Sequence, residues 1–98
     1  MAILLREDGT HDDVPLTNPT HRKLEFLQGL VGGMIEFVNG GNGSFFLVNE
    51  EGKLNGMELN AAATALYILK TGNDDVLCGP VLLISASEMR LLDSDGDN

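Results

Sequence analysis

The chain has 98 residues, of which 43% are hydrophobic and 21% are charged, and this balance fits one globular domain with its own core. Its net charge of −9 comes from 15 acidic and 6 basic residues, so it lacks the clustered lysines and arginines that direct nucleic-acid binding needs. A single cysteine, Cys78, excludes an internal disulfide and a cysteine-rich zinc site. No apolar run approaches the length of a membrane span and no basic leader opens the chain, so we expect a cytoplasmic protein.

The first third of the chain predicts a strand, a loop and a helix. Residues 2–7 form a short apolar run that ends in charges, which is typical of a strand, and the polar residues 8–18 predict a loop. Asn18 and Pro19 predict the start of a helix, since asparagine caps free amide groups and proline suits the first helical position. Apolar residues at helical spacing follow, and Gly32 and Gly33 are expected to end this helix.

The middle of the chain predicts a β-hairpin and a second helix. Residues 34–39 and 45–49 are short apolar runs on either side of the glycine-rich segment 40–44, which we expect at the hairpin tip. Asn60 predicts the N-cap of a helix over residues 61–71. The face that we expect to pack on the sheet consists of Ala62, Ala65, Leu66 and Leu69.

The last third predicts a bend at Gly79-Pro80 and a central strand over residues 81–84, buried on both faces. Residues 88–92 extend the sheet or form a final turn, and residues 93–98 form an acidic flexible tail after a single domain spanning residues 1–92.

The resulting order β-α-β-β-α-β predicts an α+β two-layer sandwich, in which both helices cover one face of a mixed sheet of about four to five strands. Apolar side chains on both faces of residues 45–48 favour self-association into a homo-oligomer.

Four segments of the chain carry a family resemblance: residues 27–36, 49–54, 59–64 and 78–81. In this order they resemble domain-of-unknown-function family 3846, and the resemblance spans roughly residues 24–84. The family is carried by bacteriophages and other bacterial mobile elements. The resemblance therefore implies a setting inside a host bacterium, and it implies no established activity.

The leading candidate for a ligand site is the segment Asn49-Glu50-Glu51-Gly52-Lys53. It places two carboxylates, an ammonium group and an amide around one turn, where they could hold a polar ligand such as the ribose of a nucleotide. We count Asn60 as a further candidate ligand-binding residue. The competing interpretation is a solvated polar turn whose asparagine and glycine satisfy the backbone.

Catalytic, metal and cofactor sites are not expected. Glu50 and Glu51 are adjacent, so on a strand they would face opposite ways and would not flank one substrate atom. His11 and His21 lack metal-site spacing. Residues 93–97 resemble the opening of a calcium loop, but their glycine comes two positions early.

Three functions remain open. The favoured one is a small, non-catalytic, phage-type binding protein that sequesters a nucleotide-like host signal in the bacterial cytoplasm as a counter-defence. The second is an acidic decoy that imitates DNA and blocks a basic host protein, which the net charge favours. The third, ranked last, is a small enzyme that uses Glu50 or Glu51.

Overall fold

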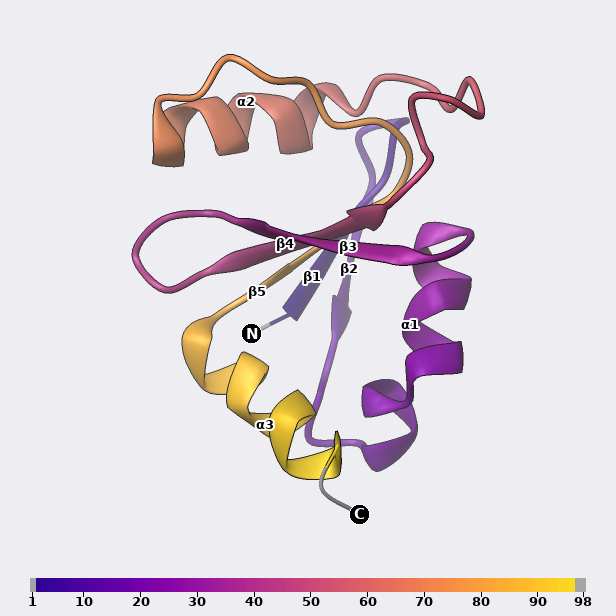
Figure 1. Cartoon of the computed structure of the whole chain (residues 1–98), viewed down its shortest axis with the longest axis vertical. Helices are drawn as coiled ribbons and strands as arrows, with labels where there is room; N and C mark the ends of the chain where they lie inside the picture. Colours follow the sequence, from indigo (N-terminus) through magenta and orange to yellow (C-terminus); the bar gives the residue numbers. More distant parts are fainter. Residues whose placement is uncertain (1, 97–98) are drawn as a thin grey trace.

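The computed structural model describes residues 2–96, with side chains described through residue 92, as a five-stranded sheet covered by helices (Figure 1). Its strands are β1 (Ala2–Leu5), β2 (His11–Val14), β3 (Ile35–Asn39), β4 (Phe45–Asn49) and β5 (Val81–Ile84). Its helices are the 3-10 helix η1 (Pro19–Arg22) and the α-helices α1 (Leu24–Val31), α2 (Ala61–Thr71) and α3 (Ala86–Gly96). The strand order is β2-β1-β5-β4-β3, and every neighbouring pair is antiparallel.

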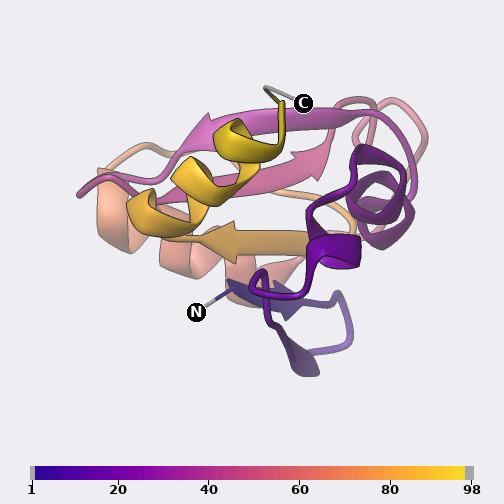
Figure 2. The same ribbon diagram turned by 90° about the horizontal axis from the view of Figure 1, so that it is seen from below.

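Helices lie on both faces of the sheet: α2 covers one face, and α1 and α3 cover the other (Figure 1). Alternate residues of the central strands point to opposite faces, as strand geometry requires. Phe46 and Val81 pack with Tyr67 of α2 in one hydrophobic cluster, whereas Leu47 and Leu82 belong to a second cluster that includes Leu27 of α1. The sheet therefore separates two cores, and the view from below shows α1 and α3 together on one side of the sheet (Figure 2).

The predicted α+β class is confirmed, and two details of its architecture are corrected. The sheet is antiparallel where a mixed sheet was expected, and the two predicted helices lie on opposite faces where one shared face was expected. The physical reason is that Phe46 and Leu47 are both completely buried, one on each face, so each face needs its own cover. The apolar side chains of residues 45–48, which favoured self-association, are covered by helices of the same chain.

The hairpin and the second helix form within the predicted bounds. Asn60 caps α2, since its Oδ1 accepts a hydrogen bond from the amide of Ala63 at 3.0 Å, and Gly72 ends the helix in the left-handed conformation. The predicted packing face of α2 was right for Leu66, which is partly buried against the core, and wrong for Ala62, Ala65 and Leu69, which are exposed. Leu69 is 83% exposed, and the buried residues of the helix are Ala63, Thr64 and Tyr67. The hydrogen bonds of Thr64, described below, set this rotation.

Three further segments differ from the prediction. Residues 11–14, expected in a loop, form β2 because they pair with β1. The first helix is interrupted at Lys23, whose ψ of 138° separates η1 from α1. Residues 86–96 form α3 where a strand or turn was expected for 88–92, because Ser85 and Glu88 cap each other's amides reciprocally. The tail predicted for residues 93–98 thus begins inside α3, and residues 97 and 98 lie outside the described part of the chain.

Candidate functional site

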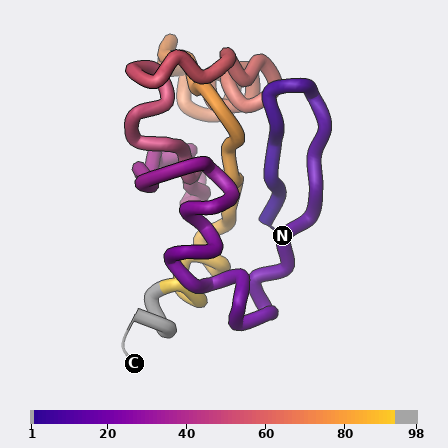
Figure 3. Tube along the Cα trace, turned by 90° about the vertical axis from the view of Figure 1, so that its right-hand side faces the viewer, coloured from indigo at the N-terminus to yellow at the C-terminus, as the bar shows by residue number. Residues whose placement is uncertain are grey.

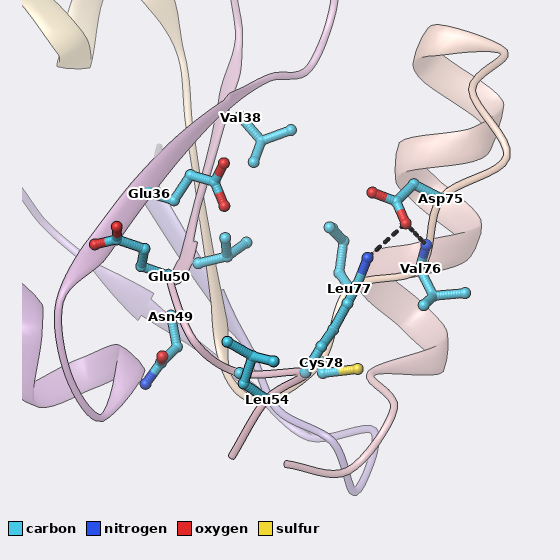
Figure 4. A pocket seen from close by; sticks show the side chains of 12 residues that line it. Glu36, Val38, Asn49, Glu50, Leu54, Asp75, Val76, Leu77 and Cys78 are labelled. Atoms are coloured by element: carbon cyan, nitrogen blue, oxygen red, sulfur yellow. Dashed lines mark hydrogen bonds and ion pairs between the residues drawn. The ribbon is translucent and has the colours of Figure 1, made fainter. Parts of the chain in front are cut away.

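A pocket of about 410 Å³ lies between the β3–β4 hairpin and the connection from α2 to β5. One wall belongs to the hairpin and the other to residues 75–78, and the turn that follows β4 closes the bottom (Figure 4). The pocket lies on the same face of the sheet as α2, because Val48 of its lining belongs to the core cluster under that helix.

The hairpin wall carries two carboxylates that strand pairing brings together. Glu36 on β3 is paired with Val48 on β4, and Glu50 follows Val48 by two residues, so both glutamates point to the α2 face. The amide of Glu50 donates to the carbonyl oxygen of Met34 at 2.8 Å, which continues the ladder past the end of β4. Figure 4 shows the Glu36 carboxylate on this wall beside the apolar side chain of Val38, whereas the carboxylate of Glu50 is turned away from the wall that carries Asp75.

The opposite wall, residues 75–78, is anchored by hydrogen bonds to α2 and its N-cap. The Thr64 hydroxyl accepts from the amide of Leu77 at 2.9 Å and donates to the carbonyl oxygen of Leu77 at 3.2 Å. The amide of Asn60 donates to the same carbonyl at 2.9 Å. The backbone of this wall is therefore anchored at Leu77, and Asp75 and Val76 are displayed across from the hairpin (Figure 4).

The bottom of the pocket depends on a close approach of two backbone segments. A Cβ atom at Gly52 would lie 3.1 Å from the carbonyl oxygen of Cys78, which is tighter than most such contacts, so glycine suits this position. Cys78 also forms a single β-bridge with Leu59. The half-buried Cys78 and the exposed Leu54 both contribute to the pocket lining.

An ion pair connects the turn after β4 to the far wall. Lys53 Nζ lies 2.6 Å from Asp75 Oδ1, which also accepts from the amide of Val76 at 2.8 Å. The hydrogen bond from Lys53, followed by that from Val76, lowers the pKa of Asp75. The hydrogen bond to Asp75 raises the pKa of Lys53, and the nearby charge of Glu36 adds to this effect. Glu36, Glu50 and Asp75 leave the pocket with an excess of negative charge over the single ammonium group.

Two of the five predicted site residues, Glu50 and Lys53, present their side chains at the pocket. Glu51 is exposed outside the lining. Asn49 borders the pocket, but its Nδ2 donates to Val31 O at 3.1 Å and its Oδ1 accepts from the amide of Glu51 at 2.8 Å, so it holds the backbone (Figure 4). Asn60 is fully buried and serves the backbone in the same way.

Sequence reasoning missed Glu36 and Asp75. The signal for Glu36 was present, because it is the polar residue between Ile35 and Phe37 in the predicted hairpin and must therefore face away from them. Asp75 gave no comparable signal. It sits in an acidic connection 22 residues after its partner Lys53, and only the folded chain brings the two together.

Among the side chains that the structure describes, those of residues 2–92, no group of three or more His, Cys, Asp or Glu is placed to hold a metal ion. No helix of the described chain has the length and apolar character needed to cross a lipid bilayer.

The fold and the site define a small α+β domain with an acidic pocket beside its edge hairpin. A family model described as Domain of unknown function (DUF3846) matches residues 1–95, and the chain belongs to this family. The match confirms the resemblance stated above and extends it over nearly the whole chain. Comparisons with curated proteins and with solved structures gave no match.

Proposed function

We propose that this protein binds a small molecule in the pocket beside the β3–β4 hairpin and does not transform it. The observation that carries the proposal is that Glu36, Glu50 and the Lys53–Asp75 pair all line one concave space of about 410 Å³. Pockets of this size that combine apolar walls with a few polar groups are the usual sites for small ligands.

The chemistry of the lining favours a ligand that offers hydrogen-bond donors and an apolar or planar body. The carboxylates of Glu36 and Glu50 accept hydrogen bonds, so they suit hydroxyl and amino groups, while Val38 and Val76 supply apolar surface. A nucleoside has both parts, in its ribose and in its base. Phosphate groups suit this pocket less well, because they would meet three carboxylates and an ammonium group already paired with Asp75.

The placement of the carboxylates supports binding over catalysis. Glu36 and Glu50 lie on the same wall, so they would approach a ligand from one side. A glycosidase-like pair needs two carboxylates that flank the bond to be broken. Asp75 on the other wall accepts hydrogen bonds from Lys53 and Val76 and takes a supporting role.

The counter-defence role, in which a phage-type protein sequesters a nucleotide-like host signal in the bacterial cytoplasm, rests on the mobile-element setting that the family resemblance implies. In that role the pocket would hold the nucleoside part of the signal and leave its phosphate groups outside. The decoy alternative has less support. In the acidic β1–β2 hairpin, Asp8 accepts a hydrogen bond from Thr10 Oγ1 at 2.6 Å, and Asp12 forms an ion pair with Arg6. These two carboxylates already have partners within the hairpin, which makes them less available to a basic host protein.

An amide NMR titration with nucleosides and their 5′-monophosphates tests the proposal. We expect nucleosides to shift the amide signals of residues 50–54 and 75–78. Replacing Glu50 with Gln removes one charge-assisted hydrogen bond and is expected to weaken binding by roughly tenfold or more. The neighbouring Glu51→Gln variant makes the same charge change outside the pocket and is the matched control.

Two results would count against the proposal. If no nucleoside shifts the pocket amides, the assigned ligand class is wrong. If Glu50→Gln and Glu51→Gln weaken binding equally, the ligand is responding to the general charge of the turn and not to the pocket.

A further inference from the structure

The two edges of the sheet differ in how they are protected. The β1–β2 and β3–β4 hairpins stand at opposite sides of the molecule, so β2 and β3 are the edge strands (Figure 3). Edge β2 carries Asp12 and Asp13 and is followed by Pro15, and charges and proline are the usual protection against pairing with another chain. Edge β3 has one charge, Glu36, and beside it Phe37 is 45% exposed.

The backbone of β3 has its outward hydrogen-bonding groups in alternate positions. Glu50 N donates to Met34 O and Gly40 N donates to Ser44 O, so even-numbered residues of this strand bond toward β4. By the same alternation, the amide and carbonyl groups of Ile35, Phe37 and Asn39 point away from β4, toward the open edge. A second strand could pair with these three residues without disturbing the hairpin.

We propose that β3 pairs antiparallel with β3 of a second copy about a two-fold axis through Phe37. This register pairs all five residues of the strand, with Ile35 opposite Asn39, Glu36 opposite Val38, and Phe37 opposite its own copy. The aromatic side chains of the two central residues then cover each other. A register centred on Glu36 would pair only three residues and would set two carboxylates against each other, which is unfavourable.

The dimer joins the two candidate pockets, and this part of the inference rests on the proposed function, whereas the pairing itself does not. Glu36 and Val38 both line the pocket on the α2 face of β3. In the Phe37-centred register, Val38 of the second copy lies across the seam from Glu36, and the reverse holds for the other pocket. Each pocket is thereby bordered by a residue of the other copy, and the two open into one symmetric cleft.

The net charge of −9 on each copy makes the strength of this dimer depend on salt concentration. Two bodies of like charge repel each other, and dissolved salt screens that repulsion beyond the Debye length. We therefore expect the dimer to strengthen as salt is raised, in contrast to an assembly held by ion pairs.

Sedimentation velocity over a range of protein concentrations, at low and at high salt, tests the pairing. The wild-type chain is expected to shift from monomer to dimer with concentration, at lower concentration in high salt. Phe37→Asp sets two carboxylates against each other at the axis and is expected to remain monomeric. Leu69→Asp makes the same charge change on the exposed side of α2 and is expected to dimerise like the wild type.

Circular dichroism checks that both variants are folded. A wild-type chain that stays monomeric under all conditions, or a Phe37→Asp variant that still dimerises, would overturn the pairing. If wild type dimerises but no nucleoside binds, the pairing stands and the proposed function fails. If monomeric Phe37→Asp binds nucleosides as tightly as the dimer, the shared cleft is wrong, although the pocket and the dimer both remain.

Discussion

Replacing Asn60 with Ala tests whether this residue belongs to the scaffold or to the ligand site. The side chain is fully buried and makes three hydrogen bonds to the backbone: its Oδ1 caps α2 at Ala63, and its Nδ2 donates at 2.9 Å to the carbonyl oxygens of Leu5 and Gly79. Loss of a helix cap costs about 1 kcal/mol. Each lost bond to a buried carbonyl costs about another 1 kcal/mol. We therefore expect the free energy of unfolding to fall by about 3 kcal/mol.

The assay is urea unfolding followed by circular dichroism, at one fixed protein concentration because dimerisation would add to the measured stability. The control is Asn18→Ala, which removes the exposed cap of η1, where Oδ1 accepts only from Thr20 at 3.0 Å. That loss is expected near the low end of capping effects, about 0.5 kcal/mol. If Asn60→Ala loses less than about 1 kcal/mol, or no more than the control, the assignment of Asn60 to the scaffold is wrong.

The remaining predictions concern two glycines and one ion pair. Gly40→Ala would place a Cβ 2.6 Å from the buried ring of Phe46, so it is expected to destabilise the fold by about 2 kcal/mol. Gly29→Ala lies in the middle of α1, where no atom comes within 4 Å of the new Cβ, so it is expected to stabilise the fold by roughly 0.5–1 kcal/mol. Thermal unfolding of both variants checks this pair of predictions, and equal effects would contradict it. Lys53→Met removes the main cause of the lowered pKa of Asp75, so we expect an NMR titration to show that this pKa rises. The pKa should still stay below its ordinary value, because the Val76 amide continues to donate to the carboxylate. An unchanged pKa would mean that the ion pair does not form in solution. Because a lowered carboxyl pKa stabilises the fold only while the group is ionised, the stability difference between wild type and Lys53→Met should vanish as the pH falls through the pKa of Asp75 in the folded protein.

Local signals in the sequence were sufficient for the elements that have clear ends. Asn60 and Gly72 mark the limits of α2, and the glycine-rich segment 40–44 marks the hairpin tip, because caps and turns depend on residues close together in the chain. The serine and glutamate that cap α3, Ser85 and Glu88, form a signal of the same kind that the prediction did not use. Strand β2 gave no such signal, since its four residues are mostly polar and become a strand through pairing with β1.

The candidate site was only half predictable. Glu50 and Lys53 were found because they share one polar turn, yet the same argument selected Asn49 and Glu51, which the fold turns to the backbone or to solvent. Which side chain of a turn faces a pocket depends on the wall opposite, and here that wall is supplied by Asp75, distant in sequence.

By itself, the sequence determined the α+β class, the hairpin, the limits of the second helix and the central position of β5, since these follow from periodicity, caps and turns within short segments. Only the tertiary structure decided that helices cover both faces of the sheet, that α2 turns Thr64 inward and Leu69 outward, and that Glu36 and Asp75 line the same pocket. The physical reason is that facing and proximity depend on contacts between segments far apart in the chain, which no local pattern of residues specifies.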